Sequence, residues 1–600
     1  MPAAPPRWTV WIVAAVAGVV SYLSFRPAGW WFAAPAALAL LYLTLRTLRP
    51  WRGFAVALVF GLAQFLPMLT WAYNAAGVLP YLALSLTSAA LLALSAVLYG
   101  YARFLLRDRS ASVPDAVLFA LAFTAADTFR QFFPFGGFPW GRLGFTQAVG
   151  PMARWAWLGG VPLVGLAAAL AGSALGVAVL ALTRWRGPAR AGGGTRARAA
   201  AANAARSAGT ASTAGPKAGS GTGSGAGTAS GAGKGSRRGP AASAGAGSGV
   251  ARAGRPGGSG GRWRTFAWAV ALAAAAVLLP LTAPINAAAQ GGSLKVGAVQ
   301  GDVEVTSEGL FARQREVLEN HVEVSRELAA QVAAKGERLD IVLWPENSTD
   351  IDPRTDEQAY ASIEAAADEL GVPVLVGAME YVNRSNRYNQ GLLWQPGLGV
   401  VEVYAKRHPA PFAEYMPARS FFRLFTSKVD LINTDMLPGS EVGVMRFDGA
   451  ALGREVALGD IICFEVAYDS IVADVVREGA EVVVVQTNNA SFGFSEESTQ
   501  QFAMARLRAI EHGRATVQIS TVGVSAAIAP DGSLLTPLTS LYEPAYFIAD
   551  LPLRTSITPA TRIGDAVCWA LMIGPLGLAV AGVGARLAKV QSARRRRPTA

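Results

Sequence analysis

The chain has 600 residues, a hydrophobic fraction of 52% and a formal net charge of +12. That hydrophobic fraction is too high for an ordinary soluble protein. The basic charge does not mark a folded nucleic-acid-binding surface, because 14 of the 53 Lys and Arg residues lie in one segment, 184–264, that lacks Asp and Glu. Without that segment 39 basic residues stand against 41 acidic ones, so we expect no nucleic-acid partner.

The few cysteines and histidines argue against a metal site or a disulfide framework. Cys463 lies in a polar region and Cys568 in an apolar run near the C-terminus, so a bridge between them is not expected. The three histidines, His321, His408 and His512, show no metal-ligand spacing. We therefore expect neither a metal nor another cofactor.

Apolar runs long enough to cross a bilayer of about 30 Å recur along the chain. The first is not a removable signal peptide, because no small-residue cleavage site follows it. We assign six transmembrane helices to residues 1–186, a seventh to 263–285 and an eighth to 564–588. The individual spans are expected at about 8–25, 30–46, 53–73, 79–101, 113–133, 154–183, 264–284 and 564–588.

The basic residues predict the orientation of these spans, because loops rich in Lys and Arg stay in the cytoplasm. With a cytoplasmic N-terminus, every basic cluster falls on that side, including the spacer between the sixth and seventh spans and the tail 589–600. The opposite loops 26–29 and 74–78 are nearly free of basic residues, and 134–153 has only Arg142. Both termini are therefore predicted to be cytoplasmic. The clusters in the loops and the tail are Arg46, Arg49, Arg52, Arg103, Arg107, Arg109 and Arg594 to Arg597.

Two segments between the spans differ sharply in composition. Residues 187–262 are Gly, Ala and Ser with scattered Arg, which cannot bury enough apolar area to fold, so we predict a disordered cytoplasmic spacer. Residues 292–553 hold 37 of the 41 acidic residues and lie between the last two spans, so we predict an extracytoplasmic domain there.

Short apolar, β-branched runs alternate with helical patterns in residues 292–553, which predicts a layered α/β domain. Runs such as VVVV indicate strands that are buried on both faces. We expect strands at 294–299, 339–344, 372–377, 400–405, 455–462, 481–486 and 516–528. We expect helices at 307–334, 356–370, 466–478 and 498–513.

Three polar residues directly follow predicted strands, where α/β sheets place ligands. These are Glu346, Lys406 and Cys463. They could serve as a base, an electrostatic stabiliser and a nucleophile. A position between a strand end and a helix start would also favour the Cys463 thiolate through the helix dipole.

Each residue also has a plain structural interpretation. Cys463 could be a small buried hydrophobic residue, Glu346 could cap a turn, and Lys406 could form a solvated ion pair of little energetic worth. Taken separately, none of the three establishes an active site.

Several motifs nevertheless occur together in a fixed order. They are WPENS (344–348), YAKRHPAPFAEYMP (404–417), GDIICFE (459–465), QTNNASFG (486–493) and RLRAIEHGRATVQISTVGVSAAIAPDG (506–532). This set resembles the carbon–nitrogen hydrolase (nitrilase) superfamily. The loop FFPFGGFPWGRLGFTQ (132–147), the multi-span N-terminal half and the single C-terminal span narrow the resemblance to the apolipoprotein N-acyltransferase family, in its actinobacterial form.

The resemblance implies an αββα sandwich on a platform of about eight helices. It places the base on Glu346, the lysine on Lys406 and the nucleophile on Cys463. Glu414 and Glu465 match further acidic positions, for which we expect a supporting role. Supporting residues also include Phe464, where many members have Tyr: its backbone N–H could still stabilise an oxyanion. The segment NASFG (489–493) departs from the Asp and Trp of many members.

The implied reaction moves an acyl chain from a membrane phospholipid, through a thioester on Cys463, to the N-terminal amine of a diacylglyceryl-cysteine lipoprotein. Membrane lipid is then a partner, and a polyprenol-phosphate mannosyltransferase is a possible neighbour of the cytoplasmic spacer. Phe412, Phe422 and Asn488 are candidate substrate-binding residues. The apolar segment 417–437 is either a lipid gate or ordinary packing.

Two other functions remain open from the sequence. One is a membrane-tethered amidase or nitrilase that uses water as the acceptor. The other is a transporter or scaffold with a binding module, for which Asp127 is the main ionisable candidate within a span.

Overall fold

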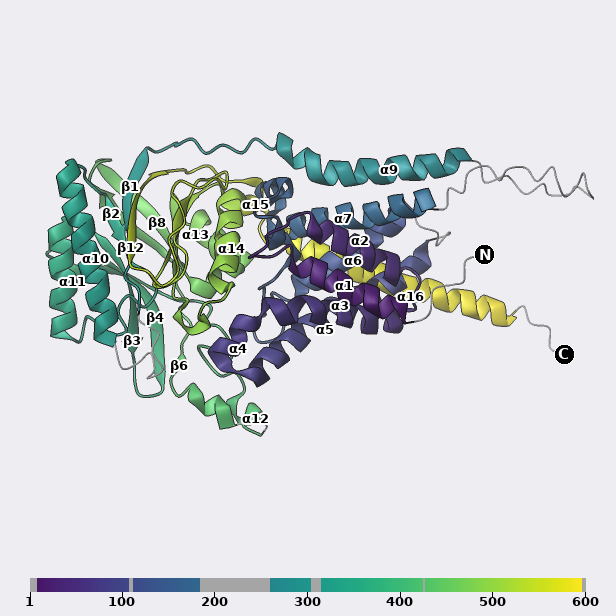
Figure 1. The fold of residues 1–600 in the computed structure, drawn as a ribbon, viewed down its shortest axis with the longest axis horizontal. Helices are drawn as coiled ribbons and strands as arrows, with labels where there is room; N and C mark the ends of the chain where they lie inside the picture. The colour runs from purple at the N-terminus through teal and green to yellow at the C-terminus, as the bar shows by residue number, and fades with distance from the viewer. Residues whose placement is uncertain (1–7, 107–111, 184–258, 304–313, 425–426, 596–600) are drawn as a thin grey trace, which may run out of the picture. The chain divides into compact units, whose positions relative to one another are not determined.

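The computed structural model describes residues 8–106, 112–183, 259–303, 314–424 and 427–595 (Figure 1). The described residues up to 180 and from 265 onward belong to one compact unit, whereas 181–183 and 259–264 fall outside it. The predicted spacer 187–262 lies outside the described residues, except for 259–262, which already belong to helix α9. The last residues of the predicted basic tail also lie outside them.

Each predicted span coincides with a helix, and the short helix α4 (Thr70–Ala76) follows α3 where the third span was expected to continue. Helices α1, α2 and α6 have 14, 13 and 17 residues, which is shorter than the roughly 20 residues of a typical transmembrane helix. A multi-span helical domain is confirmed, whereas eight crossings stay a prediction. The helices are α1 Thr9–Tyr22, α2 Ala33–Leu45, α3 Pro50–Met68, α5 Val78–Ala102, α6 Val113–Phe129, α7 Ala156–Thr183, α9 Ser259–Leu278 and α16 Ala566–Arg595. Five segments in the described part of the chain are long and apolar enough to cross a membrane: Pro50–Met68, Val78–Leu105, Pro151–Thr183, Gly261–Thr282 and Ala566–Ser592.

Two β-sheets form the domain between α9 and α16. The first has seven strands in the order β12-β1-β2-β3-β4-β5, with β6 paired to β4. Its strands are β1 Ser293–Gln300, β2 Ile341–Leu343, β3 Val374–Tyr381, β4 Asn386–Gln395, β5 Gly399–Ala405, β6 Asp435–Met436 and β12 Ala545–Pro552. The second has the order β11-β10-β9-β8-β7. Its strands are β7 Val444–Gly449, β8 Arg454–Ile462, β9 Val482–Thr487, β10 Ala515–Ser520 and β11 Ala526–Ile528.

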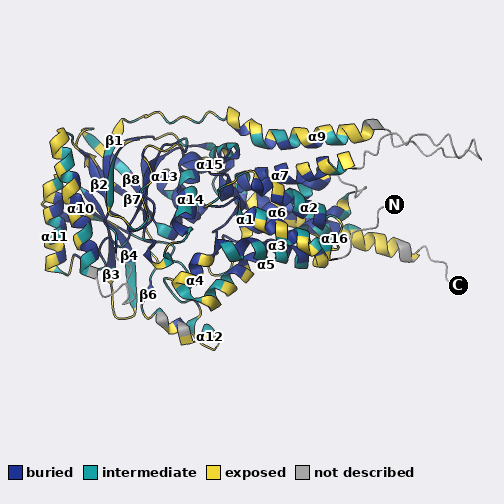
Figure 2. Cartoon of the chain, in the orientation of Figure 1, coloured by how far each residue is buried: buried dark blue, intermediate teal, exposed yellow. Residues whose placement is uncertain are grey.

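The two sheets pack face to face with helices outside, which confirms the expected layered α/β architecture (Figures 1 and 2). Strand β9 shows the alternation: Val482 and Val484 lie in the core between the sheets, whereas Val483 and Val485 join the core that contains residues of the outer helices. The apolar run VVVV is thus buried on both faces, as predicted. The outer helices are α10 Gln314–Lys335 and α11 Glu357–Leu370 on the first sheet, and α13 Asp469–Arg477 and α14 Glu497–His512 on the second.

The sequence patterns missed four strands, β4, β7, β12 and the two-residue β6, and merged two others. Strand β7 alternates between buried and exposed residues over only six positions, and β4 begins with the polar residues NRYNQ. Strand β12 lies at the edge of its sheet and is half-buried, so its apolar signal is weak. The run 516–528, expected as one strand, turns after Ser520 and forms the antiparallel pair β10 and β11.

The loop after α6 is fastened to the helices by a buried ion pair. Arg130 donates to an Asp127 oxygen at 3.0 Å and to the Trp140 carbonyl at 3.1 Å. The other Asp127 oxygen accepts the Leu143 backbone N–H at 2.8 Å. Asp127 therefore orders the loop that reaches the α/β domain.

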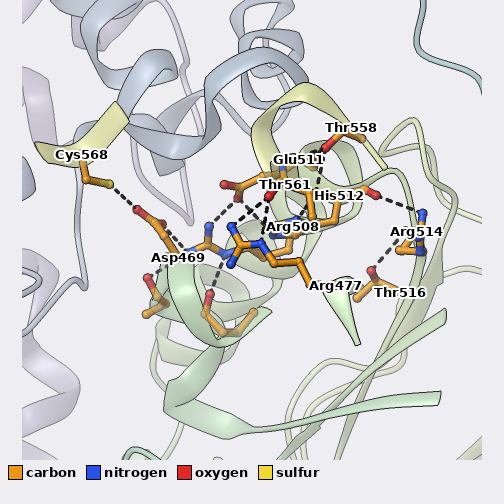
Figure 3. A network of polar contacts seen from close by, with 12 residues as sticks. Asp469, Arg477, Arg508, Glu511, His512, Arg514, Thr516, Thr558, Thr561 and Cys568 are labelled. Atoms are coloured by element: carbon orange, nitrogen blue, oxygen red, sulfur yellow. Dashed lines mark hydrogen bonds and ion pairs between the residues drawn. The ribbon is translucent and has the colours of Figure 1, made fainter. Parts of the chain in front are cut away.

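A second buried charge network joins this loop to the α/β domain. Figure 3 shows the part of this network around Asp469, Arg508 and Cys568. Arg142 donates to both Asp469 oxygens at 2.8 and 2.9 Å, and Arg508 donates to the same carboxylate at 2.8 Å. Arg508 also pairs with Glu511, and Cys568 of α16 contacts Asp469. Burial by itself would raise the pKa of Asp469, but Arg142 and Arg508 hold that pKa well below its usual range.

Replacing Arg142 with Gln should lower the unfolding temperature of the detergent-solubilised protein by several degrees. Breaking a buried pair leaves Asp469 under-compensated, which typically costs about 3–5 kcal/mol. The matched control is Arg423→Gln, which breaks the largely exposed Arg423–Asp430 pair and should cost under about 1 kcal/mol. Equal shifts for the two variants, measured by differential scanning fluorimetry, would contradict a structural role for Arg142.

Candidate active site

Four strand ends from the two sheets converge at one site. Glu346 follows β2, and Lys406 follows β5, both in the first sheet. Cys463 follows β8, and Asn488 follows β9, both in the second sheet. The site therefore exists only because the sheets are packed against each other.

Lys406 lies between two carboxylates. Its Nζ donates to Glu414 Oε1 at 2.6 Å and to Glu346 Oε1 at 3.2 Å. The side chains of Lys406 and Glu346 are 1% and 4% exposed, so these charges interact with little solvent screening. Burial would lower the pKa of Lys406, but Glu346 and Glu414 raise it well above its ordinary value. The lysine therefore stays an ammonium ion.

Neutral donors fix the orientation of Glu346. Asn389 Nδ2 donates to Oε1 at 2.7 Å, and the Asn488 backbone N–H donates to Oε2 at 2.8 Å. Thr521 Oγ1 donates to the Glu346 carbonyl at 2.8 Å. Both carboxylate oxygens are thus held in place before any substrate binds.

The two further carboxylates occupy different positions. Glu414 joins Lys406 to the following loop, because its second oxygen accepts the Ala410 N–H at 2.6 Å. Glu465 is fully buried and accepts hydrogen bonds from donors at the ends of both β5 and β8. These donors are the Tyr404 hydroxyl and the backbone N–H groups of Arg407, His408 and Ile462, at 2.7 to 3.0 Å. Glu465 thereby fastens the strand that carries the lysine to the strand that carries the cysteine.

Cys463 occupies a strained backbone position at the start of the 3₁₀ turn η7 (Cys463–Ala467). Its φ is +54°, a left-handed conformation that non-glycine residues rarely adopt and that recurs at active sites. The thiol is half-buried. The strained position lies directly between the end of β8 and the turn η7.

The expectation that a helix dipole favours the Cys463 thiolate is wrong. Helix α13 begins only at Asp469, and η7 is a single short turn. Burial, followed by the negative charge of Glu346, raises the pKa of the Cys463 thiol well above its ordinary value, although Lys406 opposes this. The environment of the free site therefore favours the thiol form of Cys463 over the thiolate.

The residue after the cysteine packs against the membrane-domain loop. The Phe464 ring stacks on Phe138 and Trp140, with centroids 5.8 and 6.2 Å apart. Trp140 Nε1 also donates to Gln500 of α14 at 2.7 Å. The apolar Phe464 side chain thus fills an aromatic stack that links the loop to the turn carrying Cys463.

Comparison with known proteins places this architecture in a family. Residues 17–174 match the model for the apolipoprotein N-acyltransferase N-terminal domain, and residues 295–572 match that for carbon-nitrogen hydrolase. An apolipoprotein N-acyltransferase from Mycolicibacterium smegmatis is 32% identical over 94% of this chain and 83% of its own length. The chain belongs to the apolipoprotein N-acyltransferase family. Proteins of the same name from Azotobacter vinelandii and Pseudomonas putida are 28% and 26% identical, covering 93% and 95% of this chain and 92% and 96% of their own lengths.

The candidate substrate-binding residues of this family member lie in two places. Phe412 and Phe422 form a cluster with Phe135 of the membrane-domain loop, with ring centroids 5.0 to 6.0 Å apart. Asn488 instead directs its backbone N–H to Glu346, and its side-chain oxygen accepts the Ala490 N–H. The aromatic cluster and Asn488 therefore contact different parts of the site.

Several residues of the site were not predicted from the sequence. Asn389 lies on β4, which was not predicted, so nothing placed it beside Glu346. Gln501 and Glu497 lie on α14, and Gln501 Nε2 contacts the Cys463 sulfur at 3.5 Å. Burial raises the pKa of Glu497 to about 8, although Asn489 donates to it. Within the described residues, no group of three His, Cys, Asp or Glu side chains is arranged to hold a metal ion.

Replacing Glu346 with Gln should accelerate alkylation of Cys463 by iodoacetamide. The substitution removes the negative charge that raises the thiol pKa, so the thiolate fraction at about pH 8 should increase roughly tenfold for a pKa lowered by about one. Lys406→Met should have the opposite effect, because it removes the opposing positive charge. The measurement is the alkylation rate from mass spectra of the Cys463 peptide, with the exposed Glu441→Gln as control. An unchanged rate in both site variants would contradict this electrostatic description.

Proposed function

We propose that this enzyme transfers an acyl chain from a membrane phospholipid, through a thioester on Cys463, to the N-terminal amine of a diacylglyceryl-cysteine lipoprotein. The observation that carries the proposal is the meeting of a buried Lys406–Glu346 pair with a strained cysteine from the opposite sheet. Membership of the apolipoprotein N-acyltransferase family supports this choice of reaction.

The first step forms the acyl-enzyme. Glu346 accepts the thiol proton as the Cys463 sulfur attacks the ester carbonyl carbon of the phospholipid, forming an S–C bond. Lys406 and the backbone N–H of Phe464 stabilise the negative oxygen of the tetrahedral intermediate. The ester C–O bond then breaks, and Glu346 returns the proton to the departing alkoxide, which leaves as lysophospholipid.

The second step transfers the acyl group to the lipoprotein. The neutral amine of the diacylglyceryl-cysteine attacks the thioester carbonyl and forms a C–N bond, while Glu346 accepts the amine proton. The C–S bond breaks, and the thiolate of Cys463 takes back the proton. The products are the N-acylated lipoprotein and the free thiol.

There is a physical reason why this reaction needs a membrane domain. Donor and acceptor both carry long acyl chains, and exposing them to water costs about 0.8 kcal/mol per CH₂ group. A hydrolase that uses water on a soluble substrate would need one anchor at most. A transport role finds no support at Asp127, because its carboxylate is engaged by Arg130 and Leu143.

We expect phospholipid and diacylglyceryl lipoprotein to be the partners of this site. A polyprenol-phosphate mannosyltransferase beside the cytoplasmic spacer stays a prediction from the sequence.

Incubating the intact enzyme with phospholipid should add the mass of one acyl chain to the protein. The adduct should map to Cys463, because the thioester forms there, and Cys463→Ala should abolish it. Cys568→Ala serves as the matched control and should keep the adduct, since Cys568 lies in α16 beside Asp469. A lipopeptide amine should discharge the adduct and become N-acylated, whereas release of free fatty acid alone would favour the hydrolase alternative. An adduct that persists in Cys463→Ala would contradict the proposed nucleophile.

The aromatic cluster of Phe135, Phe412 and Phe422 supports a role in admitting acyl chains. Helix α12 (Arg419–Phe422) presents Phe421 and the following Leu424 to solvent, at 56% and 79% exposure, which suits contact with lipid. Phe422→Asp should therefore reduce turnover with phospholipid vesicles by about tenfold, because a charge in this cluster disfavours an acyl chain. Iodoacetamide alkylation of Cys463 should stay unchanged. Full turnover in this variant would assign segment 417–437 to ordinary packing.

The proposed orientation places residues 292–553 outside the cytoplasm and both termini inside. It is supported by the arginines of the loops and the tail. A cysteine introduced at the exposed position Glu441 should react with a membrane-impermeant maleimide in intact cells. A cysteine at the exposed position Gln591 should react only after permeabilisation. The reverse labelling pattern would overturn the orientation.

A further inference from the structure

A buried chain of hydrogen bonds behind the cysteine has no part in the reaction described so far. It runs between the ends of β10 and β9, the start of α14 and the turn η7. Asn489 and Gln501 are 3% and 0% exposed, so their polar atoms depend on one another for hydrogen bonds.

The hydrogen bonds of this network run in one direction, from the Gly523 N–H to the Cys463 sulfur, and Asn489 Nδ2 also donates to Glu497. The Gly523 N–H, which can only donate, donates to Ser520 Oγ at 2.8 Å. The Ser520 hydroxyl donates in turn to Asn489 Oδ1 at 2.6 Å. Because Oδ1 accepts that hydroxyl, the Asn489 amide directs its NH₂ group to Gln501 Oε1 at 3.1 Å. The Gln501 NH₂ group is thereby left facing the Cys463 sulfur, at 3.5 Å.

Close packing holds these hydrogen-bonded side chains in this arrangement. A Cβ atom added at Gly523 would lie 2.0 Å from Asn489 Oδ1 and 2.3 Å from Ser498 Oγ. A side chain at this position would therefore displace the asparagine. Thr487 Oγ1 donates a further bond to Asn489 Oδ1 at 3.2 Å, which reinforces the same orientation.

We propose that Gln501 is a catalytic residue that donates an N–H hydrogen bond to the Cys463 sulfur and stabilises the negative charge on it. This proposal rests on the proposed function, in which Cys463 is the nucleophile. The sulfur gains charge when it loses its proton and again when the C–S bond of the thioester breaks. Hydrogen bonds to charged groups are among the stronger ones in proteins.

A neutral amide suits this position. The site already contains the charges of Lys406, Glu346 and Glu414, and burial together with Glu346 disfavours the thiolate. A donor that carries no charge stabilises the thiolate at any pH and leaves the ammonium–carboxylate balance unchanged. Asn489 takes part as a positioning residue, because it touches Gln501 and not the sulfur.

The test is the pH dependence of Cys463 alkylation by iodoacetamide in the full-length detergent-solubilised enzyme, read from the Cys463 peptide by mass spectrometry. Gln501→Met removes the donor and should raise the midpoint of the profile of alkylation rate against pH by about one pH unit. At any fixed pH below the midpoint, the thiolate fraction should then fall about tenfold. Gln501→Glu keeps the side-chain shape and the bond from Asn489 but directs an anionic oxygen at the sulfur, so its midpoint should rise further.

The matched control is Gln500→Met on the same helix. Gln500 is 5% exposed, and its amide contacts Trp140 and the Met68 carbonyl instead of the sulfur. This variant should leave the midpoint unchanged. If Gln500→Met shifts the midpoint as far as Gln501→Met does, a general disturbance of α14 explains the effect and the proposal is overturned.

A double-mutant cycle tests the positioning role of Asn489. Asn489→Asp removes the donor that orients the Gln501 amide, so Gln501→Met should shift the midpoint less in that background than in the wild type. Equal shifts in the two backgrounds would remove Asn489 from the proposal.

The acyl-adduct experiment and the alkylation midpoints together distinguish a failure of this proposal from a failure of the proposed function. If the wild type forms the acyl adduct and the folded Gln501→Glu variant keeps the wild-type midpoint, the role of Gln501 is overturned and the acyl-enzyme stands. If the midpoints shift as expected but the wild type forms no adduct, the hydrogen bond stands and the proposed reaction fails.

Discussion

Lys406 is buried between Glu346 and Glu414, and the organisation of the site depends on this arrangement. A buried ammonium ion is tolerated only when carboxylates and hydrogen bonds compensate its lost hydration. Each carboxylate also needs donors of its own, which Asn389 supplies to Glu346 and the Ala410 backbone supplies to Glu414. The position of the ammonium ion therefore fixes the conformation of the base and of the loop that follows β5.

The same site couples the two sheets to the membrane domain. Base and ammonium belong to one sheet and the cysteine to the other, and Glu465 joins the ends of β5 and β8. The turn after Cys463 is held from the membrane side, where Phe464 stacks on Trp140. It is also held from α14, where Arg508 donates to the Val466 carbonyl while pairing with Asp469 and Arg142 pairs with the same Asp469. The platform thus helps to shape the turn that carries the cysteine as well as anchoring the domain.

Local patterns predicted the elements whose apolar signal is continuous. The runs that became β1, β8 and β9 are buried on both faces, and their side chains alone indicate strands. Strands β4 and β12 have polar or half-exposed residues, so Asn389 could not be assigned to the site. The dipole argument for Cys463 failed because it assumed an α-helix directly after β8, where the chain forms a 3₁₀ turn at a positive φ.

The sequence by itself predicted the apolar helices, the acidic α/β domain between the last two, and the order of the motifs containing Glu346, Lys406 and Cys463. These features depend on residue type and short-range periodicity, which can be read along the chain. Only the tertiary structure decided which strand ends meet, that burial and Glu346 raise the pKa of the Cys463 thiol, and that Gln501 directs its amide at the sulfur. Protonation and amide orientation depend on burial and on neighbours far apart in sequence, and neither is set by local sequence.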